Sequence, residues 1–431
     1  MSIPLDRYTQ PAIRPISDFV IPTPEVRILR NGIPLHIIEA GSEDVVRLDF
    51  LFEGGRMSQS IPFLSLITNR LLREGSEHYT ASEIAEKLDY YGASLELASS
   101  TYTEYVTLYS LNKYFTQTVE VVADLLKFPT FPEKELSMVV EANKQQFQVF
   151  SQKVEVVTRR YMNQALFGKN HPLGWFQRYE DFDRLNQDLV KKHYRNHYHS
   201  GNCSIYISGK VTEDIVHDIE TFFGNESWGN VQTEKSNVNY TIETTTERHL
   251  FIEQPNAIQS ALKIGNLSIS RFHPDYQRLR VLVVLLGGYF GSRLMKNIRE
   301  DKGYTYGIDA GLIPNRENSV FIITTEADNQ YIPSVIDETY KEIDRLQQEK
   351  VSEKELDMVK NYMLGDFCRS YEGPFSLADA WIYIETGHLS PDFYGKALET
   401  IRTVTRDDII CLAQRYLCKE NLIEVVAGEK V

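Results

Sequence analysis

The chain has 431 residues, 42% of them hydrophobic and 25% charged, and its 60 acidic residues against 46 basic ones give a formal net charge of −14. This length exceeds what one hydrophobic core usually supports, so we expect more than one domain and no dependence on disulfide bonds. An acidic chain repels phosphate backbones, and no basic patch offsets the balance, which argues against binding to nucleic acid or to anionic membranes.

The predicted elements follow a similar order in the two halves of the chain. In the first half a strand with one buried face, VRLDFLF broken by Glu53, precedes predicted helices and strands at Pro62–Arg73, Ala81–Tyr91, LELASS, YVTLYSL and Thr116–Leu126. In the second half the strand SALKIGNLSI precedes Asp275–Leu286, Ser292–Arg299, TYGIDAGL, SVFIITTEA and Tyr331–Gln347. This order is typical of α+β domains.

An internal repeat defines the domain organisation. Residues 133–139 read EKELSMV and residues 353–359 read EKELDMV, 220 residues later, while Gly209 and Gly428 end matching strands 219 residues apart. We therefore predict two tandem homologous α+β domains, each a largely antiparallel sheet with helices packed on it. The polar stretch 225–247 reads as the linker, which places the domains at 1–224 and 248–431.

The ends and cysteines of the chain indicate an intracellular protein. The N-terminal stretch MSIPLDRYTQPAIRPISDF has three prolines and no apolar core, so it does not read as a signal or transit peptide, and we predict a cytoplasmic protein. The longest apolar run, Val281–Leu286, is far shorter than the roughly 20 residues that a membrane span needs. No C-x-x-C pair occurs, which predicts buried free thiols at Cys203, Cys368, Cys411 and Cys418.

A Gly-rich segment opens the second half's most distinctive motif. Residues 287–312 read GGYFGSRLMKNIREDKGYTYGIDAGL, but they contain neither G-K-[ST] nor G-x-G-x-x-G. Nucleotide binding at Gly287, Gly288 and Gly291 is therefore not expected, and close packing or a hinge is the better interpretation.

The arrangement of these segments, from about Val26 to Val431, resembles the pitrilysin/insulinase family of zinc peptidases. In that family a helix of the first half carries H-x-x-E-H, followed by a Gly five residues after the second His and then by a helix of the type A-x-E-I-A-E-x-L. Here Gly75-Ser76 and ASEIAEKLDYYGASLEL supply the trailing part. Counting back from Gly75 puts the motif positions on Leu66, Asn69 and Arg70.

The resemblance implies that the catalytic metal site is lost. Two His at i and i+4 lie on one helical face and supply zinc ligands, and the Glu between them acts as general base. Leu66 and Arg70 do not ligate zinc, and Asn69 is not a base. The family's third ligand, a Glu on a later helix, is expected near Gln145 and Gln146. We therefore expect no zinc and no other cofactor in this chain.

Two other groups of residues have partial ligand character. Glu74, Glu77 and His78 form an E-x-x-E-H pattern, but Gly75 lies inside it and a helix restarts at Ala81, so a solvated loop is the preferred interpretation. His193, His197 and His199 have ligand-like spacing at a helix end, and the corresponding segment of the second half, AQRYLCKENLIEVVAG, contains no His. A structural role is preferred, and metal binding by these histidines stays open.

Arg299 and Tyr306 match the family's second-half signature, an Arg seven residues before a Tyr. In the family such a pair comes from the non-catalytic half and hydrogen-bonds the substrate backbone. An Arg and a phenol are suitable donors to a peptide carbonyl. The alternative is a surface Arg paired with Glu300 or Asp301 and a Tyr at the edge of the core.

The resemblance yields one main hypothesis and two alternatives. The main hypothesis is a non-catalytic subunit that supplies half of a clamshell chamber and the peptide contacts of Arg299 and Tyr306. A catalytic peptidase subunit of similar size would carry H-x-x-E-H and the zinc, and a homodimer is also open. The alternatives are a self-sufficient zinc peptidase using His78 or the His193 group, and a non-proteolytic scaffold or peptide-binding protein of the same fold.

Overall fold

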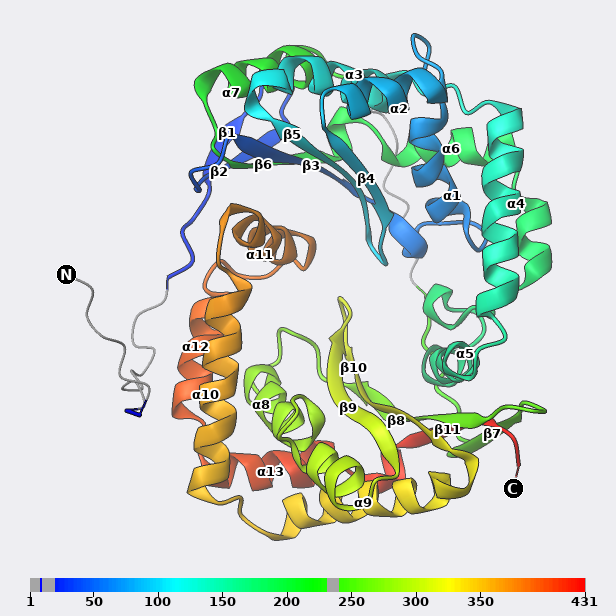
Figure 1. Cartoon of the computed structure of the whole chain (residues 1–431), viewed down its shortest axis with the longest axis vertical. Helices are drawn as coiled ribbons and strands as arrows, with labels where there is room; N and C mark the ends of the chain where they lie inside the picture. The colour runs from blue at the N-terminus through cyan, green and yellow to red at the C-terminus, as the bar shows by residue number, and fades with distance from the viewer. Residues whose placement is uncertain (1–7, 10–19, 231–239, 431) are drawn as a thin grey trace.

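The structure is a computed structural model that describes residues 8–9, 20–230 and 240–430. It contains two sheets with helices around them (Figure 1). The first sheet has the order β1-β2-β6-β3-β5-β4. Its strands are β1 (Glu25–Ile28), β2 (Pro34–Glu39), β3 (Val45–Glu53), β4 (Ser94–Ser99), β5 (Thr103–Leu111) and β6 (Cys203–Gly209). The second sheet has the order β7-β11-β8-β10-β9. Its strands are β7 (His249–Glu253), β8 (Gln259–Ser268), β9 (Thr305–Pro314), β10 (Ser319–Asp328) and β11 (Ile423–Gly428).

The two sheets have the same topology once β1 is set aside. Each is antiparallel except for one parallel pair, β2 with β6 and β7 with β11, at the same place in the strand order. The prediction of two tandem homologous α+β units is therefore confirmed. The domain boundaries at 224 and 248 stay a prediction, because residues 231–239 of the predicted linker lie outside the described residues; residues 243–245 are hydrogen-bonded to the end of α5.

The helices also follow the repeat. The helices of the first half are α1 (Leu64–Leu71), α2 (Ala81–Tyr90), α3 (Phe115–Lys127), α4 (Glu133–Phe150), α5 (Val154–Phe167), α6 (Gln187–His197) and α7 (Glu213–Ile219). Those of the second half are α8 (Tyr276–Gly287), α9 (Ile332–Gln348), α10 (Glu353–Ser370), α11 (Pro374–Thr386), α12 (Phe393–Thr403) and α13 (Arg406–Tyr416). The two EKEL segments open α4 and α10, so the repeated sequence marks equivalent helices.

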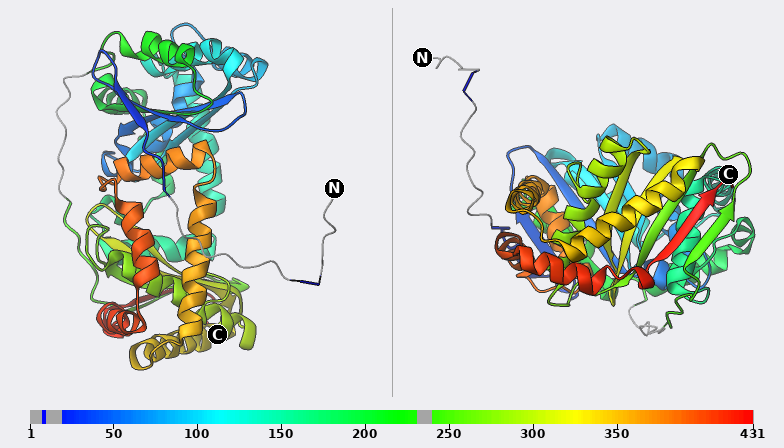
Figure 2. Two further views of the ribbon diagram at one scale, coloured as in Figure 1. Left: turned by 90° about the vertical axis from the view of Figure 1, so that its left-hand side faces the viewer. Right: turned by 90° about the horizontal axis from the view of Figure 1, so that it is seen from below.

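The helices after α4 and α10 each cross to the sheet of the other half. Met162 and Leu166 of α5 pack against Val425 in the second sheet, and Leu377 of α11 packs against Tyr206 in the first. The orange helix α11 lies against the underside of the first sheet in Figures 1 and 2. These exchanged helices bury apolar surface on both sheets and join the halves.

The exchange explains one difference from the sequence prediction. The strand VRLDFLF was expected to have one buried face, but β3 is buried on both. Arg47 and Asp49, which look like a solvent-facing pair, form an ion pair at 2.8 Å beneath α11, and Asp379 of α11 accepts a hydrogen bond from Arg47 at 2.6 Å. The charged residues are buried because a helix from the other half supplies their partner.

Equivalent hairpin tips of the two halves also meet. Residues 100–102 connect β4 to β5, and residues 315–318 connect β9 to β10. Arg316 donates a hydrogen bond to Glu53 at 2.8 Å, and its guanidinium lies 4.6 Å from the centre of the Tyr102 ring.

All four cysteines are free, but the prediction that all are buried is wrong. Cys203 is buried in β6, Cys368 and Cys418 are half-buried, and Cys411 is exposed on α13. An amphipathic helix leaves its outer positions in water whatever their chemistry. In the described part of the chain, no helix combines the length and the apolar character that crossing a membrane requires.

Candidate functional site

The degenerate motif lies on α1. Ile67 and Leu71 of α1 are buried in the hydrophobic core of the first half, and this contact fixes the rotation of the helix about its axis. Leu66 and Arg70 consequently lie half-buried on an adjoining side of the helix. Asn69 is buried and donates hydrogen bonds to the carbonyl of Tyr105 at 3.2 Å and to the phenol oxygen of Tyr198 at 3.0 Å. The position of the family's general base therefore ties α1 to β5 and to the end of α6.

On α4, the residue that faces α1 differs from the one expected. Arg70 donates a hydrogen bond to the side-chain oxygen of the buried Asn143. Gln145 and Gln146 are exposed, and Gln145 is bonded to Glu141 on the helix surface. Each residue turns an α-helix by about 100°, so Gln145 points away from the side that holds Asn143. Gln146, three residues after Asn143, lies on an adjoining side and is exposed. The count that predicted Gln145 and Gln146 starts from Phe131-Pro132-Glu133 at the beginning of α4. It locates the helix, but the residue bonded to Arg70 is Asn143.

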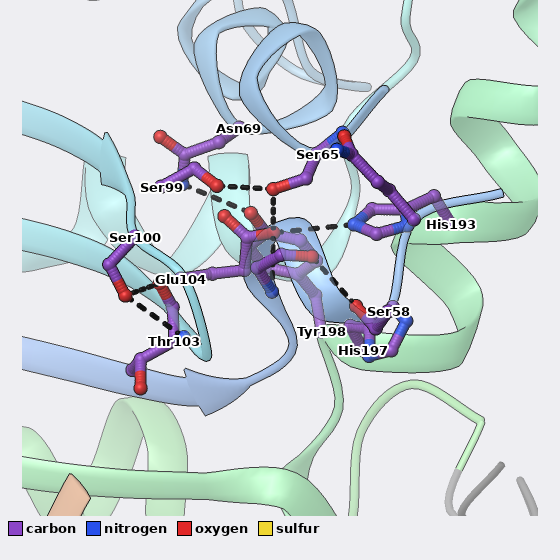
Figure 3. Close-up of polar contacts among 12 residues, drawn as sticks. Ser58, Ser65, Asn69, Ser99, Ser100, Thr103, Glu104, His193, His197 and Tyr198 are labelled. Carbon is purple, nitrogen blue, oxygen red and sulfur yellow. Dashed lines mark hydrogen bonds and ion pairs between the residues drawn. The ribbon is translucent and has the colours of Figure 1, made fainter. Parts of the chain in front are cut away.

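A buried polar cluster lies beside α1, with Glu104 of β5 at its centre (Figure 3). Glu104 is fully buried, and one of its carboxylate oxygens accepts hydrogen bonds from the Ser65 hydroxyl at 2.7 Å and the Gly55 amide at 3.2 Å. The same oxygen lies 3.3 Å from Nε2 of His193. The other oxygen has no hydrogen-bond partner among the described residues.

His193 and His197 contact each other beside Glu104. The rings of His193 and His197 lie 4.5 Å apart, centre to centre. Nδ1 of His197 is bonded to the carbonyl of Glu53 at 3.1 Å. Burial is the main reason that the pKa of His197 falls to about 4, and the neighbouring His193 lowers it further. His199 is buried close to Gly229.

His78 lies elsewhere, and its side chain is mostly exposed. Its Nδ1 pairs with Asp124 at 2.5 Å, and this hydrogen bond raises the pKa of His78. His78 is thus held by Asp124 of α3, the helix that follows β5. The solvated-loop interpretation agrees with this exposure.

The donor set on α1 and α4 does not fit zinc. Zinc in proteins takes nitrogen, sulfur or carboxylate oxygen ligands in a tetrahedral set. The positions equivalent to ligands hold an alkyl group at Leu66 and a guanidinium at Arg70, and the facing residue is an amide, Asn143. Within the described ranges, no three His, Cys, Asp or Glu side chains are close enough to hold a metal ion together.

In the second half, Arg299 lies on a π-helical turn, Met295–Asp301 (η8), a conformation often found at functional sites. Its guanidinium lies 4.7 Å from the centre of the Phe290 ring, and that ring is 62% exposed. Across the described residues, Arg299 makes no ion pair within 4 Å, so the expected alternative, pairing with Glu300 or Asp301, is not what the structure contains.

Tyr306 lies where β9 bulges. Thr305 pairs with Ala327 and Ile308 with Thr325, so Tyr306 and Gly307 stand opposite the single residue Glu326. A β-bulge redirects side chains locally, and the Tyr306 side chain is 92% exposed. The alternative of a Tyr at the edge of the core therefore does not describe its position.

A pocket of about 720 Å³ brings the two predicted residues together. Arg299 and Tyr306 both line it. Its remaining lining residues come from the end of η8 and the turn into β9, from the start of β8, and from the end of β10 with the 3-10 turn that follows it (η9, Asn329–Tyr331): Gln259, Glu300, Gly303, Tyr304, Thr305, Asp328 and Tyr331.

The Gly-rich loop before η8 serves close packing. A Cβ atom at Gly287 would lie 2.6 Å from the backbone nitrogen of Ala310, so only glycine allows α8 to approach β9 this closely. The position of β9, and with it the start of the strand that carries Tyr306, depends on this contact.

The sequence matches two protein-family models, and these matches identify the family. The description "Insulinase (Peptidase family M16)" matches residues 61–174, which include α1 and α4, and "Peptidase M16 inactive domain" matches residues 184–363, which include Arg299 and Tyr306. Among curated proteins, the chain is 24% identical over 321 residues to "Uncharacterized zinc protease YmxG" of Bacillus subtilis, covering 72% of this chain and 74% of that protein. It is also 24% identical over 262 residues to "Non-peptidase homolog YmxG" of Helicobacter pylori, covering 59% of each.

Solved structures show the same fold. A peptidase M16 inactive domain from Pseudomonas fluorescens has a TM-score of 0.82 at 20% identity, covering 95% of this chain and 98% of that one. A protease from Helicobacter pylori has a TM-score of 0.85 at 15% identity, covering 94% and 99%. A chain of complex III from Candida albicans has a TM-score of 0.72 at 14% identity, covering 94% and 95%. The two family models and the shared fold together establish that this chain belongs to the insulinase family, peptidase family M16.

Proposed function

We propose that this chain is a non-catalytic subunit of a two-chain M16 peptidase. In this role it contributes half of a clamshell chamber and holds the peptide with Arg299 and Tyr306. A catalytic subunit of similar size supplies H-x-x-E-H and the zinc ion. The name "Non-peptidase homolog" of the Helicobacter pylori relative supports an inactive role for this chain as well.

One contrast carries the proposal. The motif positions on α1 are filled by side chains without zinc-ligand chemistry, and Asn69 and Arg70 are occupied by hydrogen bonds to Tyr198 and Asn143. Within the part of the chain that the structure describes, the side chains of Arg299 and Tyr306 make no such hydrogen bonds. Tyr306 is exposed, and Arg299 is held on an exposed ring beside a pocket.

The chemistry of the second-half pair suits a peptide backbone. A guanidinium and a phenol both donate hydrogen bonds to carbonyl oxygens, and a charged donor strengthens the bond as negative charge develops on that oxygen. The Phe290 ring holds the guanidinium of Arg299 without neutralising it, so its donors remain available to a substrate.

Reconstitution with a catalytic chain tests the proposal. The M16 chain with an intact H-x-x-E-H from the same genome is co-expressed with this chain, and cleavage of a quenched fluorescent peptide library is measured for each chain and for the pair. We expect cleavage by the pair only. Arg299→Ala should lower kcat/KM of the pair by about 10- to 100-fold, because a charge-assisted hydrogen bond contributes roughly 1.5–3 kcal/mol.

The controls separate substrate contact from folding. Tyr306→Phe should lower kcat/KM by a smaller factor of about 3 to 10, since it removes one neutral donor, and Arg369→Ala, an exposed arginine on α10, should leave kcat/KM unchanged. Full activity of the Arg299→Ala pair would contradict the role of the pocket.

The three other hypotheses make different predictions. The name "Uncharacterized zinc protease" of the Bacillus subtilis relative favours a self-sufficient enzyme, which would show stoichiometric zinc and chelator-sensitive cleavage in the single chain. A scaffold of the same fold, for which the complex III similarity is the precedent, would form a complex without cleaving peptides. A homodimer would consist of two copies of this chain, and no subunit in it would carry H-x-x-E-H.

A further inference from the structure

We propose that the pocket beside Arg299 and Tyr306 is a side-chain subsite that selects a basic residue, Lys or Arg, of a bound peptide. This inference rests on the proposed function, because it assumes that the peptide backbone lies against Arg299 and Tyr306. It adds the chemical class of the side chain that enters the pocket.

The walls of the pocket are aromatic. Tyr304 and Tyr331 stack at 4.9 Å between ring centres with an interplanar angle of 22°, and Tyr306 adds a third phenol. Tyr331 is 37% exposed and Tyr306 92%. A cation near the face or the oxygen of such rings is attracted by their π electrons and phenol dipoles, and a long aliphatic stem packs well against them.

Two carboxylates contribute negative charge to the pocket from separate elements. Glu300 lies near the end of η8, and Asp328 is the last residue of β10. One oxygen of Asp328 accepts a hydrogen bond from the Gln330 amide at 3.1 Å, which fixes the side chain. For the described ranges of the chain, neither carboxylate has a Lys, Arg or His nitrogen within 4 Å.

Arg299, the basic residue of the pocket lining, does not neutralise these carboxylates by direct contact. Arg299 is held over Phe290 at 4.7 Å, outside ion-pair distance of either acid. Lys302, the next cation along the chain, acts electrostatically on Glu338. The lining therefore has two acidic side chains against one basic one, and a single incoming cation balances the charge.

Other side chains fit the lining less well. An acidic residue would face two carboxylates at close range, which is repulsive. An apolar residue would displace water from Glu300 and Asp328 without replacing its hydrogen bonds, which costs free energy. A lysine or arginine meets both requirements, since its stem covers the tyrosine rings and its charged end reaches the carboxylates.

Peptide binding to the full chain tests the inference. The probes are fluorescein-labelled dodecapeptides that differ only in one central residue, lysine, norleucine or glutamate, and binding is measured by fluorescence anisotropy. We expect the lysine peptide to bind about 10-fold more tightly than the norleucine peptide, with the glutamate peptide weakest. In the double variant Glu300→Gln/Asp328→Asn, the lysine preference should fall below 2-fold while the norleucine affinity is unchanged.

Further variants distinguish the basic side-chain subsite from the binding of the peptide backbone by Arg299. Arg299→Ala should weaken all three peptides by a similar factor, and Asp309→Asn, an exposed carboxylate of β9 outside the pocket, should change nothing. Equal binding of the lysine and norleucine peptides, with sensitivity to Arg299→Ala intact, would overturn the basic subsite and leave the proposed function standing. Failure of every peptide to bind at millimolar concentration would overturn both.

Discussion

Replacement of Glu104 tests whether the buried cluster beside α1 stabilises the chain without a metal. Glu104→Ala leaves the buried Gly55 amide without its acceptor and removes the contact with Nε2 of His193, whereas the Ser65 hydroxyl keeps Ser99 as a partner. An unpaired buried donor costs about 1–3 kcal/mol, and truncation of a fully buried side chain adds roughly 1–2 kcal/mol for the cavity. We therefore expect a loss of about 3 kcal/mol in the free energy of unfolding.

Two further variants calibrate this value. Glu104→Gln keeps an acceptor oxygen for Gly55 and Ser65 and places its NH2 group where the carboxylate oxygen has no partner, so its cost should be about 1 kcal/mol, mainly the lost charge assistance. Glu96→Ala, on the exposed side of the neighbouring strand β4, should change stability by less than about 0.5 kcal/mol.

The assay is urea denaturation of the full chain followed by tryptophan fluorescence and circular dichroism, with and without EDTA. The chelator should leave all four unfolding curves, wild type and variants, unchanged. A cost below about 1 kcal/mol for Glu104→Ala, or a destabilisation by EDTA as large as that of the variant, would refute the view that hydrogen bonds around Glu104 hold this region.

Two other stability predictions follow from the contacts. Burial lowers the pKa of His197 from 6.5 to about 4, so the unfolded chain binds the proton first as the pH falls. The free energy of unfolding should therefore drop by roughly 3 kcal/mol between pH 6.5 and pH 4, as measured by urea midpoints across this pH range. The drop should be smaller in His197→Asn, which keeps a donor for the Glu53 carbonyl. Arg316→Ala should cost about 1 kcal/mol, the sum of a half-exposed ion pair and a cation–π contact with Tyr102, whereas Arg369→Ala should have no measurable effect in the same urea assay.

The sequence predicted the architecture through its repeat. The two EKEL segments are local signals, and they mark α4 and α10 correctly. The exchange of α5 and α11 between the halves was not predictable from such signals, because it depends on contacts between distant segments. The buried pair Arg47 and Asp49 illustrates the consequence, since Asp379, the partner of Arg47, is 332 residues later in the chain.

The site was predictable to a similar extent. Counting from Gly75 located Leu66, Asn69 and Arg70 on α1, and the spacing of Arg299 and Tyr306 brought two residues into one pocket. The facing residue Asn143 was missed because a count carries an uncertainty of a few residues, and each residue rotates a helix by about 100°.

Glu104 and Phe290 were also missed, for different reasons. Glu104 left a signal, a single acid within the strand TEYVTLYSL, which is otherwise apolar or neutral. A buried charge needs partners, and this could have marked it. Phe290 left none, because an exposed aromatic residue in a loop has no characteristic spacing, and its role depends on the position of Arg299.

The zinc content of the single chain distinguishes a non-catalytic subunit from a self-sufficient zinc peptidase. The full chain is purified without chelator from zinc-supplemented cells, gel-filtered, and analysed by inductively coupled plasma mass spectrometry beside its reconstituted pair with the H-x-x-E-H subunit. We expect less than about 0.1 zinc per chain alone and one zinc per pair, with cleavage only by the pair. One tightly held zinc in the single chain, together with EDTA-sensitive peptide cleavage, would contradict it.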